Sequence, residues 1–139
     1  MPTIFTRIIE GQIPGTFVWR DEYCVVFLSI NPMAHGHCLV VPIEEVDHWV
    51  DADSDLIAHL FEVTRVIGVA LKQAFACERV GVIIAGYEVP HTHIHVIPTQ
   101  SMSELSVANA ATTIDRNSMD AAGDAIRSAL RHAGRAEVC

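Results

Sequence analysis

The sequence predicts a single α+β domain in which an antiparallel meander sheet carries a long central helix and a second helix at the C-terminus. The chain has 139 residues, half of them hydrophobic, which suffices for one core without metals or disulfides. Short β-rich runs lie on both sides of one long stretch with helical periodicity, and a second helical stretch closes the chain. This order of strands, helix, strands and helix is typical of the α+β class.

The first elements are a short helix and a hairpin. Apolar residues at positions 4, 5, 8 and 9 have helical spacing and predict a short helix, which the glycine at 11 and the Pro-Gly pair at 14 and 15 end. Two β-rich runs, residues 17–19 and 23–28, follow with three polar residues between them. We therefore expect a two-stranded hairpin whose second strand is buried.

A third strand and the long helix come next. Residues 38–42 are apolar and end at Pro42, which terminates the strand. Residues 53–75 place apolar side chains at helical intervals, and either Asp53 or Ser54 is suited to cap the helix. This helix is expected to cover one face of the sheet.

The C-terminal half predicts two more strands and a last helix. Residues 79–85 and 91–97 have the composition of an antiparallel strand pair. Residues 101–117 are small and polar and are expected to form a mobile excursion. A final helix is expected over residues 118–133, with Ser118 as cap and Gly134 beyond its end. Its inner stripe comprises Ala122, Ile126, Ala129 and Leu130.

Composition excludes several classes of partner. The net charge is −8, from 9 basic and 17 acidic residues, whereas a nucleic-acid-binding surface needs clustered cations. The N-terminus has no signal-peptide pattern, and no apolar run is long enough to span a membrane. We therefore expect a cytoplasmic protein without nucleic-acid or membrane partners.

The four cysteines, Cys24, Cys38, Cys77 and Cys139, show no Cys-x-x-Cys spacing. Because the chain also lacks a secretory signature, free thiols are expected rather than disulfides. Cys139, the last residue, is expected to be exposed.

The strongest functional signal is an array of histidines in residues 90–98, where His91, His93 and His95 alternate with other residues. In an extended strand their rings would share one face. Neighbouring protonated rings would repel one another, so the array favours neutral rings in fixed tautomers or rings that bind a metal.

Residues 91–97 resemble the His-x-His-x-His-x-x signature of the histidine triad (HIT) family of nucleotidyl hydrolases and transferases, with Thr92 at a position that is apolar in the family. Three further stretches resemble the family in the same order: residues 3–14, 31–42 and the Ala-Gly pair at 85–86. The resemblance implies a HIT-like fold.

This fold would form one domain over residues 1–139. Residues 101–139 would be its C-terminal extension.

The resemblance also implies a mechanism. His93 would attack the α-phosphorus of a nucleotide conjugate, such as a phosphoramidate or a dinucleoside polyphosphate, and form a nucleotidyl-histidine intermediate that water hydrolyses. The backbone carbonyl of His91 would hold the N–H of the attacking ring, and His95 and His37 would contact the phosphate. These four histidines are the expected catalytic residues.

The expected substrate contacts partly depart from the family. A serine, Ser29, stands where the family has an acidic residue for the sugar, and Tyr87 stands where it commonly has a glutamine. Val80 replaces an asparagine that helps hold the phosphate. The apolar positions that sandwich a purine in the family are kept: Ile4, Phe5, Ile8, Leu28 and Ile30.

Many family members carry a structural zinc, but three of its ligand positions are here Thr3, Thr6 and Glu45. These residues would not hold zinc tetrahedrally, so no metal and no cofactor is expected. The remaining histidines are assigned to surface or core: His35, His48, His59 and His132.

Three interpretations compete. The first is a HIT-family enzyme acting on a small nucleotide substrate, and the second is a non-catalytic module of the same fold that binds a nucleotide or another phosphorylated ligand. A metal-dependent hydrolase is the third, although rings along one strand converge poorly on one ion.

The resemblance also implies a homodimer. The helix at 53–75 has more apolar positions than one sheet face requires, since Val63, Val66, Ile67, Val69 and Ala70 span more than one stripe.

Overall fold

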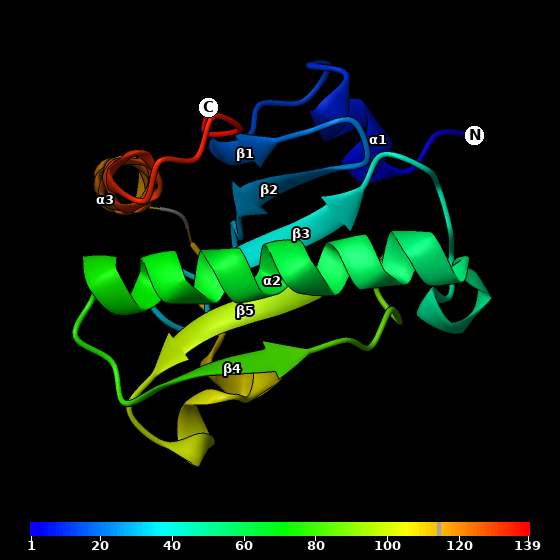
Figure 1. Ribbon diagram of the computed structural model, residues 1–139. Helices are drawn as coiled ribbons and strands as arrows, with labels where there is room; N and C mark the ends of the chain where they lie inside the picture. The colour runs from blue at the N-terminus through cyan, green and yellow to red at the C-terminus, as the bar shows by residue number, and fades with distance from the viewer. Residues whose placement is uncertain (114) are drawn as a thin grey trace.

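The computed structural model describes residues 1–113 and 115–139 and confirms the α+β class. A five-stranded antiparallel sheet in the order β1-β2-β3-β5-β4 lies between one short helix on one face and two longer helices on the other (Figure 1). The strands are β1 (Phe17–Arg20), β2 (Cys24–Leu28), β3 (Cys38–Pro42), β4 (Arg79–Ile83) and β5 (Ile94–Thr99). The helices are α1 (Ile4–Ile9), α2 (Ser54–Ala74) and α3 (Arg116–His132).

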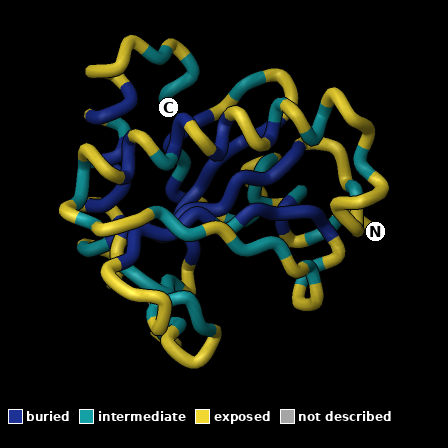
Figure 2. The backbone as a smooth tube through the Cα atoms, turned by 60° about the horizontal axis from the view of Figure 1, so that its bottom comes forward, coloured by how far each residue is buried: buried dark blue, intermediate teal, exposed yellow. Residues whose placement is uncertain are grey.

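The central strands are buried on both faces, as the tube in Figure 2 shows. Alternate side chains of β2 and β3 enter two separate cores, because neighbouring residues on a strand point to opposite sides. Val26 and Val40 pack under α2 and α3. Val25 and Leu39 belong to a smaller core with Phe5 of α1. The predicted hairpin and third strand are thus confirmed as a meander, β1-β2-β3.

The helix caps explain where α2 and α3 begin. Asp53, rather than Ser54, caps α2 by accepting hydrogen bonds from two backbone N–H groups of its first turn. The expected cap of α3 was wrong by three residues: Asp115 rather than Ser118 is the cap, and Ser118 donates its backbone N–H to the Asp115 carboxylate. Gly134 follows the helix with φ of +79°, as expected for a helix end.

The histidine strand is shorter than predicted. β5 begins at Ile94, so His91 and His93 lie in the segment that precedes it. The reason is Thr92, whose backbone N–H and hydroxyl both donate to the carbonyl of Val46 at 2.7 Å, outside the ladder of the sheet. β4 likewise ends at Ile83 instead of residue 85.

The polar stretch after β5 is more ordered than expected. It contains two short 3-10 helices, Met102–Glu104 and Val107–Asn109, and a capping box joins Ser101 to Glu104 at the first of them. A Cβ on Gly81 would lie 2.7 Å from the side chain of Leu105, so the glycine lets this stretch pack on β4. Residue 114 of the predicted excursion lies outside the described residues.

All four cysteines are free thiols, which confirms the expectation of no disulfides. Cys24 and Cys38 are buried, and Cys139 is exposed as expected. Burial raises the pKa of Cys38 to about 12, so this thiol stays protonated at neutral pH. Among the described residues, no helix is long and apolar enough to cross a membrane.

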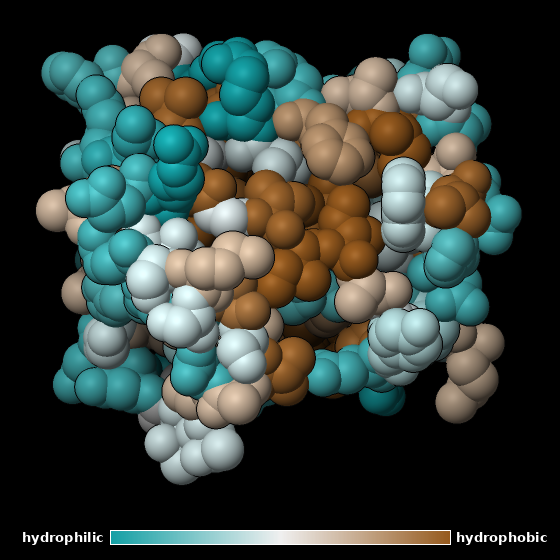
Figure 3. Space-filling view, turned by 90° about the horizontal axis from the view of Figure 1, so that it is seen from below, coloured by the Kyte–Doolittle hydropathy of each residue, from teal (hydrophilic) through white to brown (hydrophobic). Residues whose placement is uncertain are grey.

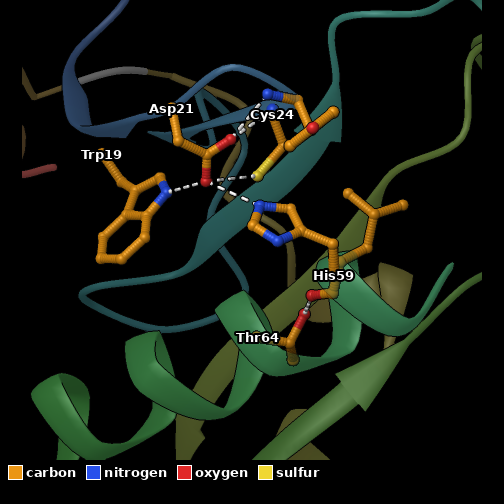
Figure 4. Close-up of polar contacts among 7 residues, drawn as sticks. Trp19, Asp21, Cys24, His59 and Thr64 are labelled. Carbon is orange, nitrogen blue, oxygen red and sulfur yellow. Dashed lines mark hydrogen bonds and ion pairs between the residues drawn. The ribbon is translucent and has the colours of Figure 1, made fainter. Parts of the chain in front are cut away.

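A hydrogen-bonded cluster around Asp21 ties the β1–β2 turn to α2 (Figure 4). The Asp21 carboxylate accepts from the Trp19 indole at 2.8 Å, from the backbone N–H groups of Tyr23 and Cys24, and from the His59 ring at 2.8 Å. Burial opposes ionisation of Asp21, but these hydrogen bonds together hold its pKa below the ordinary value.

His59 therefore has partners that its sequence spacing did not reveal. Asp21, Cys24 and His59 also form the one group of three possible metal ligands among the described residues, with ligand atoms within 4.8 Å of one another. Both Asp21 oxygens already accept hydrogen bonds, so the cluster is accounted for as a structural junction. The other three histidines of this set, His35, His48 and His132, are exposed.

We predict that Asp21→Ala lowers the free energy of unfolding by about 2–3 kcal/mol, because the Trp19 indole and the turn amides would lose their acceptor. Urea denaturation followed by circular dichroism measures this change. Glu22→Ala, at the exposed neighbouring carboxylate, is the matched control and should shift stability by less than about 0.5 kcal/mol. Equal effects of the two substitutions would contradict the role assigned to Asp21.

Candidate functional site

Four imidazoles gather on the face of the sheet that α1 covers. His95 in β5 is the cross-strand neighbour of Leu39 in β3, so both side chains point to this face. The ring centroids of His37 and His95 lie 5.1 Å apart, and those of His93 and His95 lie 5.0 Å apart. Phe5 of α1 places its ring 4.9 Å from that of His93. The fold therefore brings together the four histidines singled out in the sequence.

The hydrogen bonds assign a tautomer to His37 and His95. The backbone N–H of Met33 donates to Nδ1 of His37 at 3.0 Å, so the ring proton of neutral His37 sits on Nε2. That proton is donated to Nδ1 of His95 at 2.9 Å. Nε2 of His95 then carries a proton that is available to a ligand.

His93 has the opposite tautomer. Its Nδ1 lies 2.7 Å from the backbone carbonyl oxygen of His91, which only accepts, so Nδ1 must carry the proton. Nε2 of His93 is left with a bare lone pair. A bare imidazole nitrogen is a nucleophile that can also leave again, which suits a two-step group transfer.

The ring of His91 is fixed at both nitrogens. Nε2 donates to the carbonyl oxygen of Pro42, at the end of β3, at 2.7 Å. Nδ1 then accepts from the hydroxyl of Thr3, the residue that caps α1, also at 2.7 Å. His91 is fully buried. It therefore joins three segments of the chain and presents its backbone carbonyl to His93.

Burial keeps the rings of His37, His91 and His95 neutral. Desolvation, and next the neighbouring His95, lower the pKa of His37 to about 3, and desolvation followed by repulsion from His93 lowers that of His95 to about 4. Burial also lowers the pKa of His91, although the hydrogen bond to Pro42 opposes the shift. At neutral pH the three rings carry no charge, so each keeps one donor and one acceptor nitrogen.

Thr3, Thr6 and Glu45, which stand at the zinc-ligand positions of the family, lie close to one another and to His91. Thr3 and Thr6 place their hydroxyl oxygens 3.4 Å apart, and the backbone N–H of Thr3 and the hydroxyl of Thr6 both donate to the Glu45 carboxylate. Two neutral hydroxyls are not ligands that hold structural zinc, and their protons are already engaged. This set of residues does not fit a zinc ion, and hydrogen bonds connect it instead.

The apolar positions expected to hold a base do not form one surface. Phe5 lies against His91 and His93, and Ile8 packs in the same small core. Leu28 instead enters the core under α2 and α3 on the opposite face. Ile4 and Ile30 are both exposed, so they remain available to a ligand.

The polar substrate positions also differ in placement. Ser29 is buried beside His37, to whose carbonyl it donates its backbone N–H at 3.0 Å, and its hydroxyl accepts from the backbone N–H of Asn31. The side chain of Tyr87 is 98% exposed. Val80 packs on the core under α2, so the position matched to an asparagine does not face the histidines.

A cavity of about 270 Å³ opens beside His37, between the loop before β3 and the start of α3. Ser29 and His37 line it from the sheet side, and Asp115 and Ser118 line it from α3. The C-terminal residues, which the sequence presented only as an extension, thus line a cavity that reaches His37.

Two backbone groups of this site, the N–H of Met33 and the carbonyl of Pro42, escaped the sequence analysis, whereas the role of the His91 carbonyl was expected. The N–H of Met33 and the carbonyls of Pro42 and His91 set the tautomers of three rings. The one side chain of this kind is Thr3, which was considered only as a missing zinc ligand. Thr3 lies 88 residues before His91 in the sequence, so its contact with the histidine motif became visible only in the folded structure.

Comparison with known proteins places this geometry in context. A family model described as the HIT domain matches residues 10–102. A HIT-like protein of Borreliella burgdorferi is 36% identical over 102 residues, which cover 68% of this chain and 73% of that protein. An adenylylsulfatase of Arabidopsis thaliana is 28% identical over 100 residues, which cover 68% of this chain and 51% of that protein.

A solved structure shows the same fold. The HIT-like protein from Bartonella henselae, described as involved in cell-cycle regulation, superposes with a TM-score of 0.81 at 27% identity, over 92% of this chain and 96% of that chain.

We predict that the stability of the protein falls as pH falls from about 6.5 to about 4. In this window the unfolded histidines, with pKa near 6.5, bind protons that His37 and His95 exclude, with folded pKa values of about 3 and about 4. The stabilisation is therefore complete above pH 6.5 and lost towards the folded values. Thermal melts between pH 4 and 7.5 measure it.

Carboxylates also titrate between pH 4 and 6.5, so the contribution of His37 is isolated by comparing the wild type with a variant that lacks this ring. His37→Gln should have a shallower dependence of melting temperature on pH than the wild type. Identical slopes for the two proteins would show that His37 does not stay neutral through this window.

Proposed function

This chain belongs to the HIT domain family, and from that premise we propose that it is a nucleotidyl hydrolase or transferase acting at the α-phosphate of a nucleotide conjugate. The observation that carries the proposal is the bare Nε2 of His93, which the hydrogen bond from Nδ1 to the His91 carbonyl leaves free. The substrates considered are phosphoramidates, dinucleoside polyphosphates and similar conjugates. The likeness to an adenylylsulfatase supports an adenylyl group as the part transferred.

The proposed reaction has two steps. In the first, Nε2 of His93 attacks the α-phosphorus, a P–N bond forms, and the leaving group departs with the electrons of its bond to phosphorus. Nδ1 of His93 keeps its proton and donates it in a hydrogen bond to the His91 carbonyl oxygen. This hydrogen bond stabilises the positive charge that develops on the ring. In the second, water attacks the phosphorus, releases a proton to solvent, and the P–N electrons return to His93.

His95 and His37 support the phosphate in this scheme. Nε2–H of His95 is the free donor of the pair, because Nδ1 accepts from His37. A hydrogen bond from it to a phosphate oxygen strengthens as negative charge builds up in the transition state. His37 holds the orientation of His95 and is itself held by the Met33 N–H.

The second candidate is a non-catalytic module that binds a nucleotide or another phosphorylated ligand. Tyr87 favours it, because this side chain is almost fully exposed instead of turned to the histidines. The hydroxyl of Ser29 already accepts a backbone hydrogen bond and offers a sugar less than a carboxylate would. Trapping of a covalent nucleotidyl adduct on His93 by mass spectrometry separates the two candidates.

The first test is a substrate screen combined with histidine variants. Adenosine and guanosine phosphoramidates and dinucleoside polyphosphates are scored for release of a nucleoside monophosphate. His93→Ala should abolish turnover while nucleotide affinity stays within about tenfold, because the lost interaction belongs to the transition state. His91→Ala should cost much less, since the carbonyl remains, and His37→Ala and His95→Ala should fall between.

Turnover by His93→Ala comparable to that of His91→Ala would show that the nucleophile is misassigned. Absence of turnover by the wild type on every conjugate would favour the binding module.

We further propose a homodimer formed through β4 and α2. β4 is an edge strand, and Figure 3 shows apolar side chains gathered on the side of the molecule where β4 lies. Val82 on β4 is 44% exposed, and Phe61 and Val69 on α2 are 42% and 50% exposed. An open edge beside apolar side chains is a surface that a second copy can cover.

Light scattering coupled to gel filtration at micromolar concentration should therefore give the mass of two chains. Val82→Lys should shift the mass towards one chain, because a lysine at this position would be buried in the interface. Val107→Lys, at an apolar residue exposed in a 3-10 helix, is the matched control and should leave the dimer intact. A wild-type monomer would contradict the proposal.

A further inference from the structure

We infer that Glu45 is a positioning residue: through Thr3 it fixes the ring of His91, and with it the carbonyl that sets the tautomer of the nucleophile. The kinetic part of this inference rests on the proposed function, whereas its structural part does not. Glu45 and Thr3 themselves lie outside the set of four histidines.

Glu45 contacts the beginning of α1 through one carboxylate oxygen. Oε1 accepts from the backbone N–H of Thr3 at 2.8 Å and from the hydroxyl of Thr6. Both partners sit in the first turn of α1, whereas Glu45 lies three residues beyond the end of β3. The carboxylate therefore fastens the exit of β3 to the cap of α1.

Glu45 also settles where the hydroxyl protons of the cap point. The Thr6 hydroxyl gives its proton to the carboxylate, so it does not compete for the ring nitrogen of His91. The Thr3 hydroxyl accepts from the backbone N–H of Thr6 at 3.1 Å and keeps one proton to donate. Its nearer acceptor is Nδ1 of His91 at 2.7 Å, compared with 3.4 Å to the Thr6 oxygen.

The His91 ring is consequently held from both sides. Thr3 donates to Nδ1, and Nε2 donates to the carbonyl of Pro42 at 2.7 Å. Thr3 and Pro42 belong to the two segments that Glu45 joins, so loss of the carboxylate loosens both ends of the clamp together. Phe5, in the first turn of α1, also makes edge-to-face contacts with the rings of His91 and His93.

The position of His91 affects the proposed chemistry through His93, two residues further along the chain. His93 must hold its proton on Nδ1, which is the minor tautomer of a neutral histidine side chain in water, and its acceptor is the His91 carbonyl at 2.7 Å. If that carbonyl turns away, the proton moves to Nε2 and blocks the attacking atom. The clamp on the His91 ring resists such a turn, since ring and carbonyl belong to one residue with few free torsions.

Nitrogen NMR of the wild type and its variants measures the ring tautomers directly, without a substrate. Nδ1–H of His93 should be the single form in the wild type. Thr3→Val, which removes the donor to His91, and Glu45→Gln, which weakens the acceptor for both threonines, should each add the Nε2–H form. Thr3→Ser keeps the hydroxyl and should retain the wild-type spectrum. Glu44→Gln, at the neighbouring exposed carboxylate, is the matched control.

Kinetics on any conjugate turned over by the wild type supply the second measurement. Thr3→Val and Glu45→Gln should lower kcat by about three- to tenfold, the effect of one ordinary hydrogen bond, and leave KM within about twofold. Thr3→Ser and Glu44→Gln should retain wild-type kcat.

Unchanged His93 tautomers in both Thr3→Val and Glu45→Gln would overturn the inference, whatever their activity. Glu45→Gln alters an exposed side chain, so it remains informative even where Thr3→Val does not fold. Tautomer shifts in a protein without turnover on any conjugate would support the inference and contradict the proposed enzyme.

Discussion

The hydrogen bond from Nδ1 of His93 to the carbonyl of His91 is the constraint on which the site depends. A neutral imidazole has one proton and one lone pair, so fixing the proton on one nitrogen defines the chemistry of the other. The same rule applies to the neighbouring rings: His37 is set by a backbone N–H and in turn sets His95. Each ring has a role that follows from its partner, although the side chains are chemically identical.

Such an arrangement requires neutral rings, and burial keeps those of His37 and His95 neutral. Desolvation lowers the pKa of His37 and His95 well below the ordinary value of a histidine. A protonated ring would have two donors and no lone pair, and both the nucleophile and the tautomer relay would be lost. Because of the same burial, the free energy of unfolding falls at acid pH, whereas the rings of His37 and His95 remain neutral near pH 7.

The two-faced sheet explains how so much of the site comes from separate segments. α2 and α3 cover one face and supply most of the core, while the short α1 packs on the smaller core of the other face, where the histidines lie. α1 also contributes to the site, because its cap residue Thr3 meets His91 and its Phe5 meets His93. Glu45 is linked to this cap by two hydrogen bonds, one from the backbone N–H of Thr3 and one from the hydroxyl of Thr6.

The sequence alone determined the elements and the chemistry of the motif. Periodicity predicted α1, α2 and the strands before α2 closely, because local apolar spacing and caps decide such elements. A repeated residue type at fixed spacing also made His91, His93 and His95 visible without a fold, whereas His37 was expected only from the resemblance to the HIT family. Tertiary structure decided the rest: where β5 begins, which face Leu28 and Val80 take, and which atoms hold the rings of His37 and His91. Those outcomes depend on contacts with Val46, Pro42 and Thr3, which lie dozens of residues away along the chain, and local sequence carries no record of partners that distant.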